Sequence, residues 1–208
     1  MKLSEELRER TAEAHRGAEG SAFVARFVRG GLDRDMFSRH MLALHGVYEA
    51  LEDAFERLKD EPRLGAFVLP QLWRRLALER DLDFLRGPHW RSEEPVAAAR
   101  AYADRLRWIE ENQPIRLVSH SYVRYLGDLS GGQMLKGLAA RQLELDGDGL
   151  RFYEFPAIHD PLVFKAEYRR RLDELALAYG ERDTIVEEAR TAFQLNAAIF
   201  DQLVTGAR

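Results

Sequence analysis

The sequence predicts an all-α fold, because apolar residues recur at helical spacing along almost the whole chain and the pattern breaks at glycine and proline. No segment shows the strict alternation of apolar and polar residues that is typical of a half-buried strand. The 208 residues are enough for one hydrophobic core, and no linker, repeat or low-complexity tract divides them. We therefore expect a single helical domain over residues 1–208.

Three helices are expected in the first ninety residues. The first covers about residues 5–19, with Ser4 as its N-cap and two glutamates in its first turn, where the helix dipole favours acidic side chains. After a pair of glycines, a long helix extends over about residues 33–61, with apolar residues at i, i+3 and i+4 spacing. A third helix follows a proline and covers about residues 71–86.

Four more helices are expected in the rest of the chain. Their approximate ranges are 95–109, 114–145, 162–179 and 183–204. Prolines open the first two, and an acidic glycine loop at residues 146–149 ends the second. The stretch 151–161 is expected to be an ordered loop, and Gly180 is expected to separate the last two helices as a C-cap.

Composition and charge exclude several classes of function. The formal net charge of -4 argues against a general affinity for nucleic acid. No apolar run approaches the roughly 18 residues of a membrane-spanning helix, and the charged N-terminus is unlike a signal peptide. We therefore expect a soluble, cytoplasmic chain without a membrane anchor. Because there is no cysteine, only histidine or carboxylate can bind a metal.

One part of the helix expected at 114–145 conflicts with helix propensity. The segment YLGDLSGGQMLKG contains four glycines within an amphipathic pattern, and the three at 127, 131 and 132 cost about 2 to 3 kcal/mol relative to alanine. Gly127 and Gly131 share a face, where the missing Cβ atoms let the backbone approach a flat ligand, and the pair Gly131-Gly132 predicts a kink. Close packing against another helix is an equally good explanation for the glycines.

A second feature is a histidine in the middle of an apolar helix face. His15 shares this face with Leu7 and Thr11, and Glu19 follows four residues later. Glu19 could accept the proton of one ring nitrogen and so direct the other nitrogen toward a metal. The simpler alternative for a lone histidine is a hydrogen-bonded residue of the core.

The two features together resemble the haem oxygenase family. RTAEAHRGAE around His15 is similar to its proximal-helix motif, and SYVRYLGDLSGGQMLKG is similar to its distal-helix motif. Segments similar to the family also follow in family order over essentially the whole chain; they are FVRGGLDRDMF, LALHGVYEALE, LERDLDFLRGPHW, FKAEYRRRLD and EEARTAFQLNAAIFDQL. The resemblance implies that haem b is bound between the first helix and a kinked glycine helix. Haem would be cofactor and substrate, and oxygen would open the ring to give biliverdin, carbon monoxide and ferrous iron.

The resemblance also implies roles for particular residues. His15 would be the proximal iron ligand with Glu19 as its hydrogen-bond partner, and Asp128 would anchor a network of water molecules on the distal side. The other matched positions are Tyr48, Arg124 and Asn196 at this network, Gly127, Gly131 and Gly132 over the porphyrin, Arg8, Tyr122, Lys165 and Arg169 at the propionates, and Thr11, Phe27, Phe193 and Phe200 in the pocket. For the aromatic residues, plain core packing is an equally good explanation.

Two other interpretations stay open on the sequence. A haem-binding carrier or sensor would keep His15 but would have no need of Asp128, and a helical scaffold that uses the glycines only for packing would not bind haem at all. If the chain is an enzyme, its electrons should come from a separate ferredoxin or flavoprotein reductase, because no G-x-G-x-x-G motif follows a strand. We expect Lys165 and Arg169 to orient the ring for cleavage at the α-meso carbon.

Overall fold

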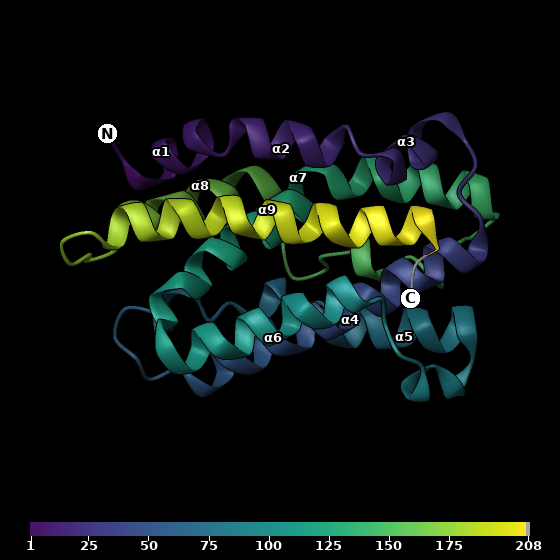
Figure 1. Cartoon of the computed structure of the whole chain (residues 1–208), viewed down its shortest axis with the longest axis horizontal. Helices are drawn as coiled ribbons and strands as arrows, with labels where there is room; N and C mark the ends of the chain where they lie inside the picture. Colours follow the sequence, from purple (N-terminus) through teal and green to yellow (C-terminus); the bar gives the residue numbers. More distant parts are fainter. Residues whose placement is uncertain (207–208) are drawn as a thin grey trace.

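The expected all-α fold is confirmed by a computed structural model, which describes residues 1–206; none of these residues forms a strand (Figure 1). The α-helices are α1 (Leu3–Arg10), α2 (Ala12–Glu19), α3 (Ala22–Arg29), α4 (Arg34–Arg57), α5 (Arg75–Arg86), α6 (Ala97–Asn112), α7 (Leu117–Leu143), α8 (Pro161–Asp173) and α9 (Glu181–Thr205). Short 3-10 turns lie in the connections between some of them. None of the helices in the described part is long and apolar enough to cross a membrane.

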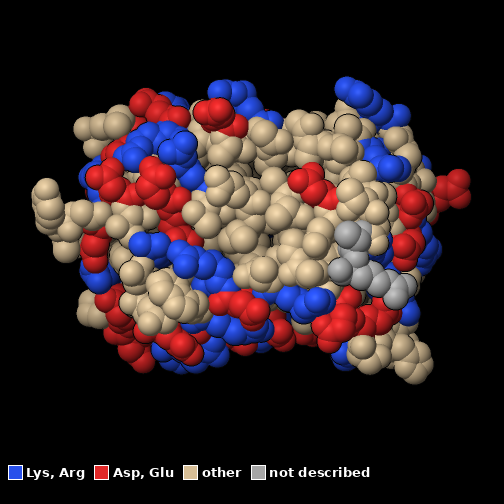
Figure 2. Space-filling model, viewed as in Figure 1, with Lys and Arg blue, Asp and Glu red and all other residues tan. Residues whose placement is uncertain are grey.

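The helices are arranged around α9. Figure 1 shows α1, α2 and α3 along one edge of the molecule and α4, α5 and α6 along the opposite edge, with α7, α8 and α9 between them. In this arrangement α9 packs against α2, α3, α6 and α7, and α4 packs against α5 and α6. In the same view, the surface over the middle of α9 is mostly uncharged (Figure 2). Helix α9 therefore contacts helices of both edges of the molecule.

Helix α4 supplies much of the core. It begins as expected, because the Asp33 side chain caps it by accepting the backbone N–H of Met36 at 2.8 Å. The apolar residues that predicted this helix are all buried; they are Phe37, Met41, Leu44, Tyr48, Leu51 and Phe55. The helix ends at Arg57, so its predicted range of 33–61 is slightly too long.

The first predicted helix is two helices. The two helices meet at Thr11, whose backbone N–H and hydroxyl both donate to the Leu7 carbonyl, at 3.0 and 2.7 Å. Ser4 is not the N-cap: the helix begins at Leu3, and the buried Ser4 donates its backbone N–H to Asp173 on α8 at 2.9 Å. The predicted cap was wrong because Ser4 lies in the first turn of the helix, where the Asp173 carboxylate from 169 residues away satisfies its free N–H.

Two further predictions need correction. Residues 22–29, which we did not expect to be helical, form α3, and the Ser21 side chain caps this short helix by accepting the Val24 N–H. Helix α8 ends at Asp173 rather than near residue 179. Gly180, with φ of 81°, precedes α9 as its N-cap and does not end the helix before it.

The other predicted helices are present with shifted ends. The helix expected after Pro70 begins only at Arg75, because residues 70–72 form a 3-10 turn. A 3-10 turn also occupies residues 114–116, immediately before α7. Helix α7 continues through the pair Gly131-Gly132, at which the sequence predicts a kink.

Candidate functional site

Four of the predicted site residues meet in one buried polar cluster. Tyr48 on α4 donates its hydroxyl to Asp128 on α7. Arg124, one turn earlier on α7, donates its Nε to the Tyr48 hydroxyl oxygen at 3.2 Å and its Nη2 to Asp128 Oδ1 at 3.4 Å. Its Nη1 donates to Asn196 Oδ1 on α9 at 2.8 Å. The Tyr48–Arg124–Asp128–Asn196 cluster thus joins α4, α7 and α9.

The environment of the cluster shifts the pKa of each of its titratable groups. Burial raises the pKa of the Asp128 carboxyl, and the positive charge of Arg124 and the hydrogen bond from Tyr48 only partly oppose this effect. Burial also raises the pKa of Tyr48 well above its ordinary value, so the hydroxyl keeps its proton. Burial alone would lower the pKa of Arg124, but nearby Tyr48 and Asp128 outweigh it and hold Arg124 in its charged form. The cluster therefore contains a fixed cation beside a carboxyl group that can take up and release a proton.

The glycines of α7 are not explained by close helix packing. A Cβ atom added at Gly127 or at Gly131 would meet no other atom within 4 Å, so the side of α7 next to Asp128 is open at these positions. At Gly132, a Cβ would be in ordinary contact with the ring of Tyr153, at 3.5 Å. The packing alternative is thus not supported at Gly127 and Gly131.

Helix α2 is unusual because none of its residues is buried. The His15 side chain is 49% exposed, which excludes the alternative of a core histidine. Its Nδ1 lies 3.3 Å from Glu19 Oε2, and its ring makes an edge contact with Phe193 of α9, with 5.5 Å between ring centroids. The Nε2 atom has no hydrogen-bond partner within residues 1–206. His15 therefore has the orientation and exposure of a potential ligand.

Helices α1 and α8 carry three cationic side chains that form no salt bridge among the described residues. They are Arg8 on α1 and Lys165 and Arg169 on α8. Lys165 donates to the Ser130 hydroxyl of α7 at 3.2 Å, and the charges of Arg169 and Arg8 act on Tyr122 of α7, where they partly offset the rise in pKa that burial causes. None of Arg8, Lys165 and Arg169 forms a salt bridge in the part of the chain that the structure describes. By contrast, the neighbouring Arg170 and Arg171 both pair with Glu167. The unpaired cations are available to an anionic group.

The predicted pocket residues fall into two groups. Phe193 contacts His15, and Thr11 is buried where α1 meets α2. Phe27 and Phe200 instead join Phe23 in an aromatic cluster between α3 and α9, which agrees with plain core packing.

Sequence analysis missed two residues beside the cluster. Arg74 is buried near Tyr48 and Asp128, and its guanidinium donates to the Phe152 carbonyl at 3.2 Å. The Tyr153 ring covers Gly132, and its buried hydroxyl has no partner within the protein. Both belong to connections between helices, where no periodic pattern indicates which side chains turn inward.

The described residues contain no group of three or more histidine, aspartate and glutamate side chains that could hold a metal ion alone. Within residues 1–206, His15 is therefore not part of a metal site made of protein side chains alone. An exposed histidine, an open glycine face and unpaired cations together fit a flat, anionic ligand that carries its own metal.

Comparisons with known proteins agree with this description. The profile of the family described as heme oxygenase matches residues 1–202. Heme oxygenase 1 of Rattus norvegicus is 42% identical over 205 residues, which are 97% of this chain and 71% of that protein. Heme oxygenase 1 of Synechocystis sp. is 40% identical over 204 residues, which are 98% of this chain and 85% of that protein.

Solved structures show the same similarity. The crystal structure of heme oxygenase-1 from Synechocystis sp. PCC6803 in complex with heme has a TM-score of 0.94 and 38% identity, and covers 99% of this chain and 96% of that chain. Heme oxygenase from Leptospira interrogans has a TM-score of 0.93 and 45% identity, with 97% of this chain and 100% of that chain covered. A TenA homologue from P. horikoshii shares only the fold, with 15% identity and a TM-score of 0.73.

Proposed function

The chain belongs to the haem oxygenase family, and from this premise we propose how its own residues bind haem and direct the reaction. The protein is a haem oxygenase, an enzyme that degrades haem, as the sequence predicted. We propose that the products are biliverdin, carbon monoxide and ferrous iron, formed from haem b with oxygen and electrons supplied from outside. Bound haem supplies both the iron that activates oxygen and the ring that is oxidised.

His15 is the proposed ligand of the haem iron. Because Glu19 lies beside Nδ1, it favours the tautomer that carries a proton there and leaves the lone pair of Nε2 for the metal. The unburied apolar face of α2 would become covered when the ring binds. The edge contact with Phe193 limits rotation of the imidazole.

The open glycine side of α7 is proposed to face the other side of the ring. The absence of side chains at Gly127 and Gly131 lets the helix backbone approach a flat surface, which offsets the low helix propensity of these residues. The unpaired cations Arg8, Lys165 and Arg169, with the hydroxyl of Tyr122, would bind the two propionates.

Asp128 is the proposed source of protons for the reaction. Its carboxyl group is held between the Tyr48 hydroxyl and the Arg124 guanidinium, so its position is fixed. Burial raises the pKa of this carboxyl group, and we propose that it passes protons to a hydrogen-bonded water molecule. The open glycine positions beside it leave room for such water.

Electron supply and location are further proposals. Residues 1–206 contain no strand, and hence no strand–turn–helix unit of the kind that binds a nicotinamide or flavin dinucleotide. We therefore propose a separate ferredoxin or flavoprotein reductase as the donor. A cytoplasmic location stays a prediction from the sequence.

The observation that carries this proposal is the presence, in one chain, of an exposed histidine on α2 and of glycine positions on α7 that are open beside the Asp128 carboxyl group. The test is to mix the haem-free protein with haem, add a reductant in air, and record the absorption spectrum. We expect the Soret band of a histidine-ligated complex, which then gives way to the absorption of biliverdin. A stable Soret band without bilin would favour a carrier or sensor. No Soret band would favour a scaffold and overturn the proposed site.

A further inference from the structure

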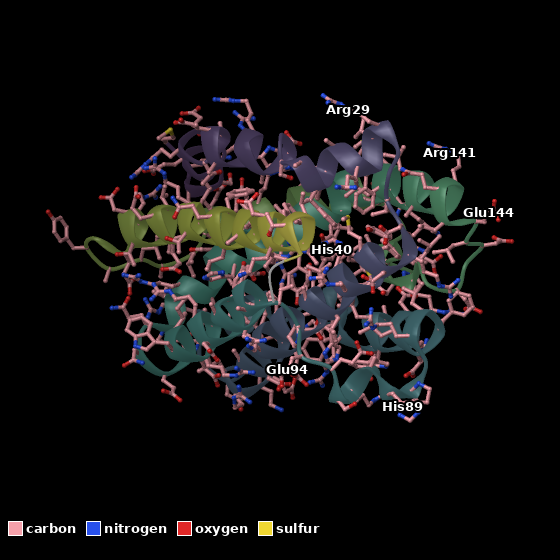
Figure 3. The ribbon with its side chains drawn as sticks, turned by 45° about the vertical axis from the view of Figure 1, so that its right-hand side comes forward. Arg29, His40, His89, Glu94, Arg141 and Glu144 are labelled. Atoms are coloured by element: carbon pink, nitrogen blue, oxygen red, sulfur yellow. The ribbon has the colours of Figure 1, made fainter. Side chains whose placement is uncertain are left out.

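A second histidine lies inside the molecule near the Tyr48–Arg124–Asp128–Asn196 cluster. His40 of α4 is only 6% exposed, and its ring is surrounded by aromatic side chains of α3 and α9. The ring centroids of Phe23, Phe200 and Phe27 lie 4.7, 5.8 and 6.5 Å from that of His40. Figure 3 shows His40 in the interior beside the C-terminal half of α9, whereas the labelled His89 and Glu144 lie on the outside.

Neither ring nitrogen of His40 has a hydrogen-bond partner within the protein. Burial, with a smaller contribution from the positive charge of Arg124, lowers the pKa of His40 to about 3, so the ring is neutral at physiological pH. A neutral imidazole offers one N–H donor and one acceptor. Buried polar groups in native proteins are almost always hydrogen-bonded to protein or to ordered water, and this ring therefore requires an explanation.

The cluster contains the complementary groups. Arg124 has five N–H groups, and within residues 1–206 its hydrogen bonds to Tyr48, Asn196 and Asp128 use three of them. Asn196 and Phe200 are one turn apart on α9, so the residue that binds Arg124 and a residue that contacts His40 lie on the same side of that helix. A water molecule at this place could accept from Arg124 and donate to the acceptor nitrogen of His40, which gives it the two polar partners that a buried water needs.

We propose that His40 is a positioning residue that binds buried water together with Arg124, and so extends the Tyr48–Arg124–Asp128–Asn196 cluster toward α3. The water fixes the orientation of the Arg124 guanidinium, which in turn holds the Asp128 carboxyl. The part of this inference that concerns catalysis rests on the proposed role of Asp128, whereas the water contact itself does not. The competing explanation is that the imidazole only fills space among the phenylalanines.

The test compares His40→Leu, which has similar volume but no hydrogen-bonding group, with His40→Gln, which keeps a donor and an acceptor. In the haem-free protein labelled with 15N-histidine, we expect the unprotonated ring nitrogen of His40 to show the upfield 15N shift of a hydrogen-bonded acceptor in wild type at pH 7. With haem bound, we expect His40→Leu to form biliverdin about three- to tenfold more slowly in a single turnover, the factor that one hydrogen bond corresponds to. We expect His40→Gln to recover at least half of that loss, and haem affinity to stay within twofold in both variants.

Three results would overturn the proposal. One is a 15N shift of the unprotonated His40 nitrogen that is typical of an imidazole without a hydrogen bond. Another is a His40→Leu variant that turns over like wild type and unfolds at a higher temperature, which is the expected result for a space-filling histidine with unsatisfied nitrogens. The third is a His40→Gln variant as slow as His40→Leu. If Asp128→Ala instead formed biliverdin normally, the proposed role of Asp128 would fail, and the experiment on the haem-free protein would still decide the water contact.

Discussion

Phe193 and Asn196 lie one turn apart on α9 and contact the two helices between which haem is proposed to bind. The Phe193 ring meets His15 of α2 at 5.5 Å between centroids, and Asn196 accepts a hydrogen bond from Arg124 of α7 at 2.8 Å. A single turn of α9 therefore helps to position both the proposed iron ligand and the proposed proton donor. The two sides of the site should nevertheless be separable by mutation, because they use different side chains.

Asn196→Ala should weaken turnover without weakening the bond between haem and His15. The change leaves one N–H of the buried Arg124 unpaired, which costs about 1 to 3 kcal/mol of stability and loosens the support of Asp128. We expect biliverdin formation to slow by about tenfold, since about 1.4 kcal/mol corresponds to that factor. Single-turnover spectra and haem titrations measure the two effects. Gln194→Ala, at an exposed position of the same helix, is the matched control and should resemble wild type.

His15→Ala should fold normally but lose the spectrum of a histidine-ligated haem. Because the side chain is 49% exposed, we expect the free energy of unfolding to change by no more than about 0.5 kcal/mol. Added imidazole should restore ligation. His120 offers no alternative, because it is fully buried and its ring nitrogens are bonded to Tyr102 and Glu188. A wild-type spectrum from His15→Ala would show that the proximal assignment is wrong.

Local patterns predicted the helices and much of the site. The spacing of Gly127 and Gly131 and of His15 and Glu19 lies within one helix each, so the sequence alone carries these relationships. The features that escaped prediction depend on contacts between distant parts of the chain. Ser4 lies in the first turn of α1, where Asp173 of α8 accepts its backbone N–H, and no local pattern contains that contact.

The Tyr48–Arg124–Asp128–Asn196 cluster also depends on contacts between distant parts of the chain. Tyr48, Arg124 and Asn196 come from three helices, and only the family resemblance grouped them with Asp128 before the structure was known. For His40, no pattern in the sequence indicated a role. It differs from an ordinary buried residue only in what surrounds it, which spacing along the chain does not reveal.

Removal of both Lys165 and Arg169 should mix the products of ring opening. These cations have no carboxylate partner among the described residues, and we expect them to fix the rotation of the ring by binding its propionates, so that wild type cleaves the α-meso carbon. Chromatography of the biliverdin isomers is the measurement. Arg170→Ala is a close control, because Arg170 already pairs with Glu167 and Glu174. If wild type gave mainly another isomer, the assignment of these two residues would be refuted.

Glu52 should make the protein less stable as the pH rises. This buried carboxyl accepts the backbone N–H groups of Arg74 and Arg75, yet burial raises its pKa from 4.5 to about 7. A pKa that is higher in the folded state gives a stabilising contribution that is complete below about pH 4.5 and is lost as the pH rises through 7.

Glu52→Gln removes this dependence while keeping an acceptor oxygen for the two N–H groups. Compared with wild type, the variant should be more stable by about 1 to 3 kcal/mol at pH 8, with a smaller difference at pH 5. Denaturant unfolding at both pH values measures this. Equal differences at the two pH values would mean that Glu52 does not titrate in this range in the folded protein.

Asp128 gives the sharpest test of the proposed mechanism. Asp128→Ala leaves His15 and the unpaired cations intact, so we expect haem to bind with near-normal affinity and the spectrum of the histidine-ligated complex to be kept. The variant should form little or no biliverdin, because no carboxyl group remains to pass protons to water beside Gly131. The reduced complex should then consume oxygen without opening the ring.

Asp128→Asn separates the two functions of the carboxyl group. The amide keeps one acceptor oxygen, so it can accept from Tyr48 or from Arg124 but does not replace both carboxylate oxygens, and it carries no titratable proton. Partial turnover in this variant would mean that holding water in place matters more than relaying protons, whereas loss of turnover as complete as in Asp128→Ala would assign the effect to the proton itself. The alternative is that Asp128 only forms an ion pair with Arg124, like those on protein surfaces, which stabilises the fold by a few tenths of a kcal/mol. In that case the single-turnover rate and the product would be unchanged in both variants. That result would contradict the proposed mechanism, because it would show that the buried cluster maintains the fold and takes no part in the reaction.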